Sequence, residues 1–365
     1  MALHNAFSKS IVTGLCALLA ATANGADTIR QYQMVPGSSG YELQLKEIAR
    51  PAARPDQVLV RVHAVSLNRR DLSMLNGQYG PGGAAENGVP LSDGAGEVIA
   101  VGAGVTRFRV GDRVAGTFFE HWVDGAPAAE ALSSARGGNA AGMLTEVIAT
   151  DANGLVKIPD HLSFEEAATL PCAGVTAWVA LFERGGLQAG DFVLLEGTGG
   201  VSVLGLQLAV AAGAKPIITS SSDEKLARAK QLGAFGTVNY RKNPEWQREV
   251  RALTGDEGVE HVLEVGGRDT LPRALEALAY GGHMALIGGL SGFASDVPVG
   301  GLMGRGVSVT GIYVGSRAHF EALNEFIAEH RIRPVVDRVF DFEQAPAAFE
   351  LMDSGDFFGK IVIRL

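Results

Sequence analysis

The stretch Asp191-Phe192-Val193-Leu194-Leu195-Glu196-Gly197-Thr198-Gly199-Gly200-Val201-Ser202 decides how this chain of 365 residues folds. Its apolar run before the glycines is typical of a buried parallel strand. Gly197 and Gly199 remove side chains where a backbone would approach a pyrophosphate closely. A helix beginning after them would offer free N–H groups to that anion. Ser202 stands where such a turn usually has its third glycine, so the assignment of a dinucleotide-binding turn depends on the pattern of elements around it.

That surrounding pattern alternates between strands and helices. Residues 215–222 are typical of a second strand ending in hydroxyls, and residues 223–232 of a helix that stops at Gly233. Further strands are expected at 261–265 and 284–287. Strands alternating with helices of roughly 10–15 residues indicate parallel βαβ units. We therefore predict an α/β chain with a doubly wound Rossmann domain that binds a dinucleotide.

The part before residue 158 has a different pattern. Short alternating strands, such as 42–48 and 58–65, are separated by turns that contain glycine, which favours a small β-barrel-like domain. Ser163 and Glu166 are spaced as a capping box at the start of a helix. The terminal strand at 360–365 is expected to return to this first domain, because a lone edge strand would leave unpaired backbone groups.

Composition excludes several classes of protein. The chain is 47% hydrophobic and 19% charged, which excludes a disordered chain. Its formal net charge is −9, with no run of Lys or Arg, which argues against nucleic acid or an anionic membrane as a partner. Cys16 and Cys172 are the only cysteines, so a Cys-rich zinc ribbon and a disulfide framework are excluded.

The N-terminus has the pattern of a secretory signal peptide. Lys9 precedes an apolar stretch at 11–21, and small residues lead to Asp27. The stretch is too short for a comfortable membrane span. Residues 1–26 are therefore interpreted as a signal peptide, which implies periplasmic or secreted protein. The alternative is a disordered leader or a start codon set too early, with a cytoplasmic protein. The leader has no Arg-Arg pair for export of a folded enzyme.

Several motifs, in order, resemble the medium-chain dehydrogenase/reductase superfamily from about residue 28 to the end. The markers are Gly111-Asp112-Arg113-Val114, Glu166-Ala167-Ala168-Thr169-Leu170-Pro171, the glycine turn at 197–201 and Gly359-Lys360-Ile361-Val362. Residues 67–71 and 90–96 are similar to the branch of quinone oxidoreductases and zinc-type alcohol dehydrogenase-like proteins.

This resemblance implies a GroES-like β-barrel-type catalytic domain at 27–160, completed by about 316–365. It implies a Rossmann NADP-binding domain at 161–315. It also implies a nicotinamide cofactor, a small carbonyl or quinone substrate and a homodimer.

Zinc alcohol dehydrogenases of the superfamily bind the catalytic metal through a Cys, a His with a neighbouring Glu, and a second Cys or Asp. By the motif match, Asn68 stands at the first Cys, Ser92-Asp93 at the His-Glu pair, and Cys172 near the last ligand. One thiol with an amide and a hydroxyl makes a poor zinc site. No Cys lies between residues 117 and 142, where relatives hold a structural zinc. We predict a metal-free enzyme.

The residues after the second Rossmann strand favour NADP(H) over NAD(H). A carboxylate there would bind the ribose diol of NAD and repel a 2′-phosphate, but Ser220 holds that position. Hydroxyls and Lys225 can bind a phosphate. Ser222 or Asp223 could also simply cap the next helix. The predicted cofactor-binding residues are Gly197, Thr198, Gly199, Gly200, Val201, Ser220, Ser221, Ser222, Lys225, Tyr240, Gly266 and Gly288.

Without zinc, the chemistry most easily reached is hydride addition to a quinone or an α,β-unsaturated carbonyl. Charge then develops on an oxygen that donors can stabilise, and water or a loosely placed acid can supply the proton. Removing a proton from an alcohol would need a base, and the motifs show no obvious one. The alternatives are an NAD(P)-dependent alcohol dehydrogenase or aldehyde-ketone reductase, and a non-catalytic relative that binds NADPH.

Five polar residues are the candidates for catalysis. Asn68 is predicted to contact the nicotinamide or the substrate oxygen, although Asn also forms turns. Thr176 could bond the carboxamide of the nicotinamide, or only its own helix. Asp71 and Asp93 are possible acids or bases, or partners of nearby arginines. Tyr79 could cover the substrate, or face solvent from its glycine-rich loop.

Overall fold

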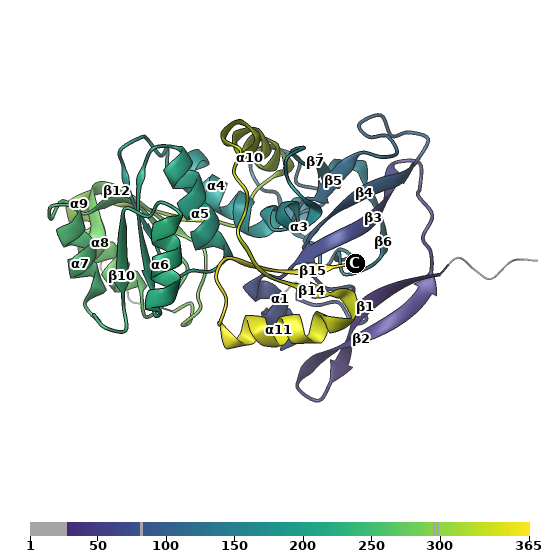
Figure 1. Cartoon of the computed structure of the whole chain (residues 1–365), viewed down its shortest axis with the longest axis horizontal. Coiled ribbons are helices and arrows are strands. Elements are labelled where there is room, and N and C mark those ends of the chain that lie inside the picture. The colour runs from purple at the N-terminus through teal and green to yellow at the C-terminus, as the bar shows by residue number, and fades with distance from the viewer. Residues whose placement is uncertain (1–27, 81–82, 295–296, 298) are drawn as a thin grey trace, which may run out of the picture.

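The computed structural model describes residues 28–80, 83–294, 297 and 299–365. The predicted leader at 1–26 lies outside these residues. Figure 1 shows two lobes, one built on a parallel sheet and one on a strongly twisted antiparallel sheet, with helices packed where the lobes meet. In the described part of the chain, no helix is long and apolar enough to cross a membrane.

The first lobe is a GroES-like sheet with strand order β14-β15-β3-β4-β5-β7, and β6 pairs with β3. A hairpin of β1 (Thr28–Gly37) and β2 (Gly40–Ala49) and the short helices α1 (Arg69–Leu75) and α2 (Ala129–Leu132) lie beside it. The sheet strands are β3 (Gln57–Ser66), β4 (Asp93–Val101), β5 (Arg113–Gly116), β6 (Val147–Asp151), β7 (Leu155–Lys157), β14 (Val336–Asp341) and β15 (Lys360–Arg364).

The second lobe is a Rossmann-like parallel sheet with strand order β10-β9-β8-β11-β12-β13. Its central strand is the apolar run before the glycine turn, whose Leu194 and Leu195 are fully buried. The strands are β8 (Phe192–Leu195), β9 (Lys215–Ser220), β10 (Gly236–Asn239), β11 (Val259–Glu264), β12 (Leu278–Leu286) and β13 (Ser308–Gly311). The helices are α5 (Gly200–Ala211), α6 (Asp223–Gln231), α7 (Trp246–Leu253), α8 (Leu271–Ala277) and α9 (Val299–Arg305).

Helical segments connect the lobes. The capping box predicted at Ser163 is confirmed, because its hydroxyl accepts from Glu166 N and the Glu166 carboxylate accepts from Ser163 N at the start of α3 (Phe164–Ala167). The apolar run after it forms α4 (Val175–Trp178) between two π-helical turns, rather than one regular helix. Helix α10 (Arg317–His330) packs against α4.

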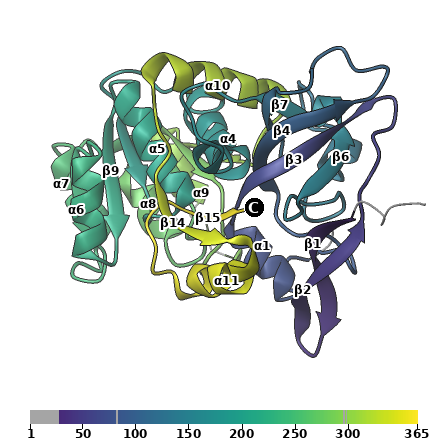
Figure 2. The same cartoon turned by 45° about the vertical axis from the view of Figure 1, so that its right-hand side comes forward.

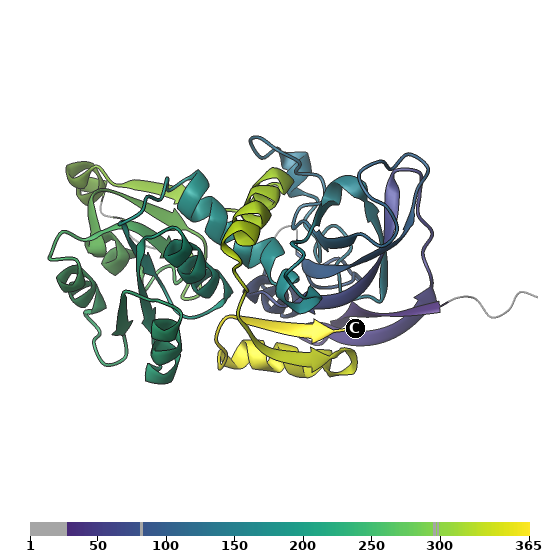
Figure 3. The same cartoon turned by 45° about the horizontal axis from the view of Figure 1, so that its top comes forward.

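The end of the chain returns to the first lobe. Strand β15 pairs antiparallel with β3, opposing Val362 to Ser66, and parallel with β14. Helix α11 (Ala345–Ser354) packs against both β14 and β15, and Figures 2 and 3 show the yellow C-terminal segment within the lobe that holds the purple N-terminal strands. This return brings Lys360, the first residue of β15, close to the glycine turn of the second lobe.

One predicted strand begins later than expected. The pattern at 143–148 predicts a strand, but β6 starts at Val147. Met143 N and Leu144 N instead donate to the carbonyls of Leu91 and Pro90. These two adjacent apolar residues are both fully buried, and the Leu144 carbonyl accepts from Tyr32 N of β1, so contacts with the loop before β4 and with β1 hold this segment before β6 begins.

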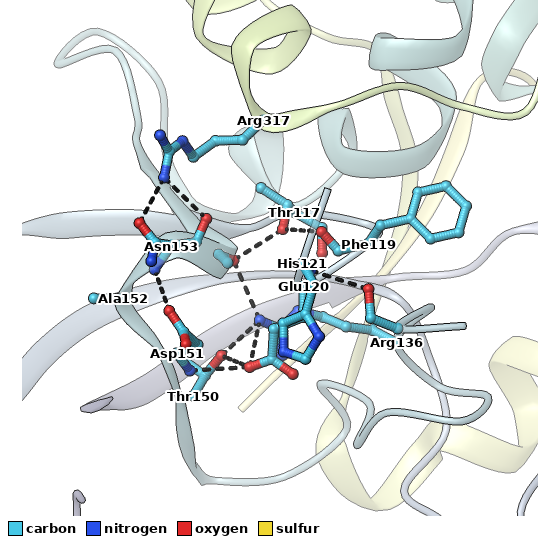
Figure 4. Close-up of polar contacts among 12 residues, drawn as sticks. Thr117, Phe119, Glu120, His121, Arg136, Thr150, Asp151, Ala152, Asn153 and Arg317 are labelled. Carbon is cyan, nitrogen blue, oxygen red and sulfur yellow. Dashed lines mark hydrogen bonds and ion pairs between the residues drawn. The ribbon is translucent and has the colours of Figure 1, made fainter. Parts of the chain in front are cut away.

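A buried arginine organises the long loop at 117–142. The side chain of Arg136 is 1% exposed and lies 3.5 Å from the Glu120 carboxylate, while it donates to Thr150 Oγ1 and the Gly154 carbonyl. Figure 4 shows this network next to the bond from Arg317 of α10 to Asn153. A buried cation needs a full set of partners, and here they come from the loop (Glu120 and the Thr117 carbonyl) and from β6 and the turn after it (Thr150 and the Gly154 carbonyl).

The Arg136 network gives a stability prediction. Arg136→Met leaves the Glu120 carboxylate without its cation, so we expect the free energy of unfolding to fall by about 3–5 kcal/mol. Arg54→Met is the matched control, because that side chain is 72% exposed. Its replacement should change the free energy of unfolding by less than about 0.5 kcal/mol. Urea unfolding followed by circular dichroism measures both. Equal midpoints for the two variants would refute the role of Arg136.

Candidate functional site

The glycine turn and the C-terminal strand meet at the junction of the lobes. Gly359 N donates to the Thr198 carbonyl at 2.9 Å, and Gly199 forms a bridge with Gly359. A Cβ placed on Gly200 would lie 2.5 Å from Cδ of Lys360, so only glycine lets the lysine stem pass. The start of β15 therefore lies directly under the N-terminus of α5.

Lys360 is the centre of a buried polar cluster. Its Nζ donates to Asn68 Oδ1 at 2.6 Å and to the Leu67 carbonyl at 2.7 Å, and lies 3.7 Å from Asp93 Oδ2. Ser92 Oγ donates to Asp93 Oδ1 at 2.7 Å, and Asn68 Nδ2 donates to Ser92 Oγ at 3.4 Å. Lys360, Asn68, Ser92 and Asp93 thus form a closed polar ring.

The donor set of this ring does not fit a zinc ion. The backbone N–H of Cys172 donates to Asp93 Oδ2 at 3.3 Å, and burial raises the pKa of the Cys172 thiol well above its ordinary value. Zinc needs a thiolate, imidazole or carboxylate, and here the carboxylate already faces a lysine ammonium. No group of three or more His, Cys, Asp or Glu side chains in the described residues is placed to hold a metal.

Asp71 lies beside the ring but has a structural partner. It is the third residue of α1, and its Oδ2 accepts from Asn68 N at 2.8 Å. Burial raises its pKa to about 6, although the Arg70 guanidinium opposes the shift and Asp93 adds to it. This carboxyl group therefore fixes the backbone of Asn68 at the start of the helix.

Arg70 and two tyrosines form the adjoining wall. The Arg70 guanidinium lies over the rings of Phe118 and Tyr79, at 4.5 and 5.1 Å from their centroids. Its Nη1 donates to the Arg136 carbonyl at 2.8 Å, which links the wall to the Arg136 network. Tyr79 of the first lobe and Tyr313, which follows β13, contact each other through their hydroxyls. The side chain of Tyr79 is therefore placed at the junction of the lobes.

Two apolar residues with strained backbones flank the site. Leu91 has a φ of 70° and is fully buried just before Ser92, and Val314 has a φ of 53° just after Tyr313. A left-handed conformation is unfavourable for such residues and persists only where the surrounding structure imposes it. Thr176 is buried in α4.

The glycine turn fits the phosphates of a dinucleotide. Gly197 has a φ of 71°, and a Cβ added at Gly197 or Gly199 would meet no atom within 4 Å, so the turn leaves open space in front of α5. Ser202, in place of the third glycine, donates from its hydroxyl to the Glu196 carbonyl at 2.6 Å. Thr198 and Val201 complete the turn. The free N–H groups at this helix start favour an anion.

A pair of buried carboxyl groups joins this turn to the loop after β11. Glu196 Oε2 accepts from Val265 N and Gly266 N at 3.3 Å, and Glu264 Oε1 accepts from Gly267 N at 2.7 Å. Glu196 Oε1 and Glu264 Oε2 are buried without a hydrogen-bond partner among the described residues, and burial, followed by the Glu264 charge, raises the pKa of Glu196. Glu196 therefore keeps its proton to a higher pH than an ordinary glutamate, where the glycine turn meets the loop after β11.

The remaining predicted cofactor residues are spread more widely. Ser220 ends β9 with its side chain buried, Ser221 follows it, and Ser222 caps α6 by accepting from Lys225 N. Lys225 Nζ donates to the Gly355 carbonyl, toward the C-terminal loop. Tyr240 is half exposed after β10. Gly266 and Gly288 pack closely, because a Cβ on either would lie within 2.8 Å of a neighbour.

Sequence reasoning missed Lys360, Glu196, Glu264 and Lys242. A lysine inside an otherwise apolar terminal strand is a usable signal, and so is a glutamate at the end of each of two buried strands. Lys242 and Asn239 both hold the Asp223 carboxylate, and the Lys242 ammonium lowers its pKa. The Asp223 carboxylate therefore already has two side-chain partners.

The comparisons with known proteins cover most of the chain. The sequence model of the family described as zinc-binding dehydrogenase matches residues 200–329, and that of the alcohol dehydrogenase GroES-like domain matches residues 54–160. A zinc-type alcohol dehydrogenase-like protein of Schizosaccharomyces pombe is 43% identical over 85% of this chain and 91% of its own length.

Two further proteins are similar along nearly their whole length. Quinone oxidoreductase-like protein 2 of Bos taurus is 31% identical over 88% of this chain and 89% of its own. The crystal structure of a candidate alcohol dehydrogenase from Sinorhizobium meliloti is 41% identical, with a TM-score of 0.87 over 93% of this chain and 99% of the other.

The carboxyl pair predicts a pH dependence of stability. A raised folded-state pKa means that the folded protein keeps a proton that the unfolded chain loses above its ordinary value of 4.5. The contribution of this proton to the free energy of unfolding is therefore complete below that pH. It is lost as the pH rises through the pKa of the folded protein, at up to about 1.4 kcal/mol per pH unit. Glu196→Gln mimics the protonated form, so it should gain stability relative to the unaltered protein as the pH rises.

Denaturant unfolding of both proteins at several pH values checks this expectation. The exposed Glu329→Gln is the matched control and should follow the unaltered protein at every pH. A constant difference between Glu196→Gln and the unaltered protein across the range would show that the pKa of Glu196 is not raised in the folded protein.

Proposed function

Because the chain belongs to the medium-chain dehydrogenase/reductase superfamily, and is an oxidoreductase of that family, we propose that it reduces quinones or α,β-unsaturated carbonyls with NADPH and without a catalytic metal. The observation that carries this proposal is the closed ring of Lys360, Asn68, Ser92 and Asp93. By the motif match, Asn68, Ser92 and Asp93 stand where zinc enzymes of the family have metal ligands, and the cation of this ring is an ammonium group.

A reduced nicotinamide bound at the glycine turn would supply the hydride. The residues of this chain have three tasks around it. The turn at Gly197–Gly200 and the start of α5 hold the phosphates, and Asn68 offers an amide N–H to the substrate oxygen. Tyr79 and Phe118 form an apolar wall with a polar edge, which suits a planar unsaturated acceptor.

The electron count requires no further redox group. Hydride forms a bond to the β-carbon of an enone, the electron pair of the C=C bond shifts between the α-carbon and the carbonyl carbon, and the carbonyl pair moves onto oxygen to give an enolate. A proton from water then adds to the α-carbon and the carbonyl re-forms. For a quinone, hydride together with a proton from water gives the hydroquinone. The charge that develops on oxygen lies beside a donor held in a largely dry site, where such a contact is strongest.

Names of the relatives support two functions. The bovine relative is named quinone oxidoreductase-like, and the Schizosaccharomyces relative zinc-type alcohol dehydrogenase-like. An alcohol dehydrogenase or aldehyde-ketone reductase is the second candidate, and Asp71, with its pKa of about 6, is the observation that favours it. A relative that binds NADPH without turnover is the third.

The end of β9 supports NADPH as the cofactor. Ser220 presents no carboxylate to the ribose, and the carboxylate of Asp223 is neutralised by Lys242. A 2′-phosphate in this region would meet hydroxyl and ammonium groups rather than a free negative charge. Lys242 is the ammonium group that pairs with Asp223, whereas Lys225 Nζ donates to the Gly355 carbonyl.

A homodimer is supported by an exposed apolar face around β13. This strand ends the six-stranded sheet and pairs with β12 alone among the described strands. An unpaired edge with exposed apolar side chains around it is a surface that a second copy can cover by a twofold arrangement. The exposed apolar residues here are Tyr280, Leu290, Phe293, Val297, Val299, Met303 and Val309.

Activity after metal removal tests the proposed function. We expect NADPH to be oxidised with a 1,4-benzoquinone or an enone such as methyl vinyl ketone, at unchanged kcat after dialysis against EDTA. NADH should give at least about tenfold lower kcat/KM, because it lacks the phosphate contacts. Loss of turnover on dialysis, restored by zinc alone, would favour the alcohol dehydrogenase. Tight NADPH binding with no turnover of either acceptor would favour the non-catalytic relative.

The dimer is tested by charges placed on the apolar face. Val309→Glu combined with Met303→Glu should convert the dimer to a monomer, because two carboxylates would be buried at the interface. Val110→Glu, at an exposed apolar residue of the other lobe, should leave it intact. Light scattering during size-exclusion chromatography measures the molar mass of both variants. A dimeric double variant would place the interface elsewhere.

A further inference from the structure

The hydrogen bonds around Lys360 can run in only one direction. An ammonium group donates and never accepts, so the Asn68 oxygen must be the atom that faces Lys360. A carboxylate accepts and never donates, so the Ser92 hydroxyl hydrogen must point to Asp93. The two ends of the ring therefore fix the orientation of the amide and of the hydroxyl between them.

The fixed amide leaves one donor for a ligand. With Oδ1 held by Lys360, the Nδ2 group of Asn68 lies on the other side and uses one hydrogen toward Ser92 Oγ, at 3.4 Å. Its second hydrogen bonds to no other described residue. A free asparagine could turn its amide over and present an oxygen, which would repel a carbonyl or enolate oxygen.

On the premise of the proposed function, we propose that Lys360 is a positioning residue, which holds the amide of Asn68 so that its Nδ2 hydrogen is always offered to the substrate oxygen. Lys360 does this from the end of the chain, 292 residues away from Asn68 in sequence. The catalytic contact is made by Asn68, and Lys360 acts through it.

The surroundings suit a rigid lysine. Its side chain is 3% exposed, and its stem lies against Gly200, where a Cβ would clash. The Leu67 carbonyl and the Asp93 carboxylate complete the partners of the ammonium group. A side chain with three fixed partners and a packed stem has few rotamers left, so the amide that it holds is fixed as well.

The test uses four variants of the full chain with its cofactor: Lys360→Met, Lys360→Arg, Asn68→Ala and the double variant Lys360→Met with Asn68→Ala. The probe is 4-nitrophenol, titrated into the complex with NADP⁺. Its phenolate resembles an enolate oxygen, and it accepts no hydride under these conditions. The shift of the phenolate absorbance gives the dissociation constant without turnover.

We expect Lys360→Met and Asn68→Ala each to weaken phenolate binding by about tenfold or more, and Lys360→Arg to restore part of it. The double variant should bind within about twofold of Asn68→Ala, because a residue that acts through another adds nothing once that residue is gone. In quinone reduction, kcat should fall with the phenolate affinity. The exposed Lys230→Met is the matched control and should behave as the unaltered protein.

Three results would overturn the proposal. The first is unchanged phenolate binding in Lys360→Met. The second is a double variant in which the two losses multiply, which would mean that Lys360 acts independently of Asn68. The third is a loss in Lys360→Met that appears only in the affinity for NADPH, measured by its fluorescence. If Lys360→Met does not fold, Asn68→Asp serves instead, because it keeps the acceptor for Lys360 and removes the donor. It should weaken phenolate binding as much as Asn68→Ala does.

The phenolate titration and the turnover assay separate the two proposals. A protein that reduces no quinone or enone, yet binds phenolate through Asn68 and Lys360, would disprove the proposed function and keep the inference. A protein that reduces quinones equally well in all variants would do the opposite.

Discussion

The contact between the ammonium group of Lys360 and the amide of Asn68 is the constraint on which the rest of the site depends. A buried cation is tolerated only where acceptors surround it, and this one has a carbonyl, an amide oxygen and a carboxylate within 3.7 Å. Those acceptors come from the loop before α1 and from the start of β4. The cation therefore holds the start of β15 against the N-cap of α1 and the first residue of β4, beside the glycine turn of the second lobe.

The topology makes this contact possible. Strand β15 crosses from the Rossmann side and pairs with β3, so that its first residue emerges beneath the glycine turn. The same turn is tied from its other side by the carboxyl pair of Glu196 and Glu264, which links it to the loop after β11. One polar cluster thus holds the glycine turn that would bind the cofactor phosphates, and the other holds the Asn68 amide that would contact the substrate oxygen.

The sequence was sufficient for the architecture and for half of the site. The apolar run before Gly197 and the alternating elements after it predict the parallel sheet, and the motif order locates Asn68, Asp93 and Cys172 in one region. Lys360 could not be placed in the same way, because its partners lie nearly 300 residues earlier and are set by strand pairing. Lys225 Nζ donates to the Gly355 carbonyl, 130 residues later in the chain, and no local sequence pattern records such a contact.

The central claim is that a lysine-centred ring occupies the place of the metal. The most direct test is a crystal structure of the protein grown with NADP⁺ and excess zinc, with anomalous diffraction collected at the zinc edge. We predict no zinc peak among Asn68, Asp93 and Cys172, and Lys360 Nζ in contact with Asn68 Oδ1. A full-occupancy zinc ion bound by Asp93 and Cys172, with Lys360 displaced, would contradict the account.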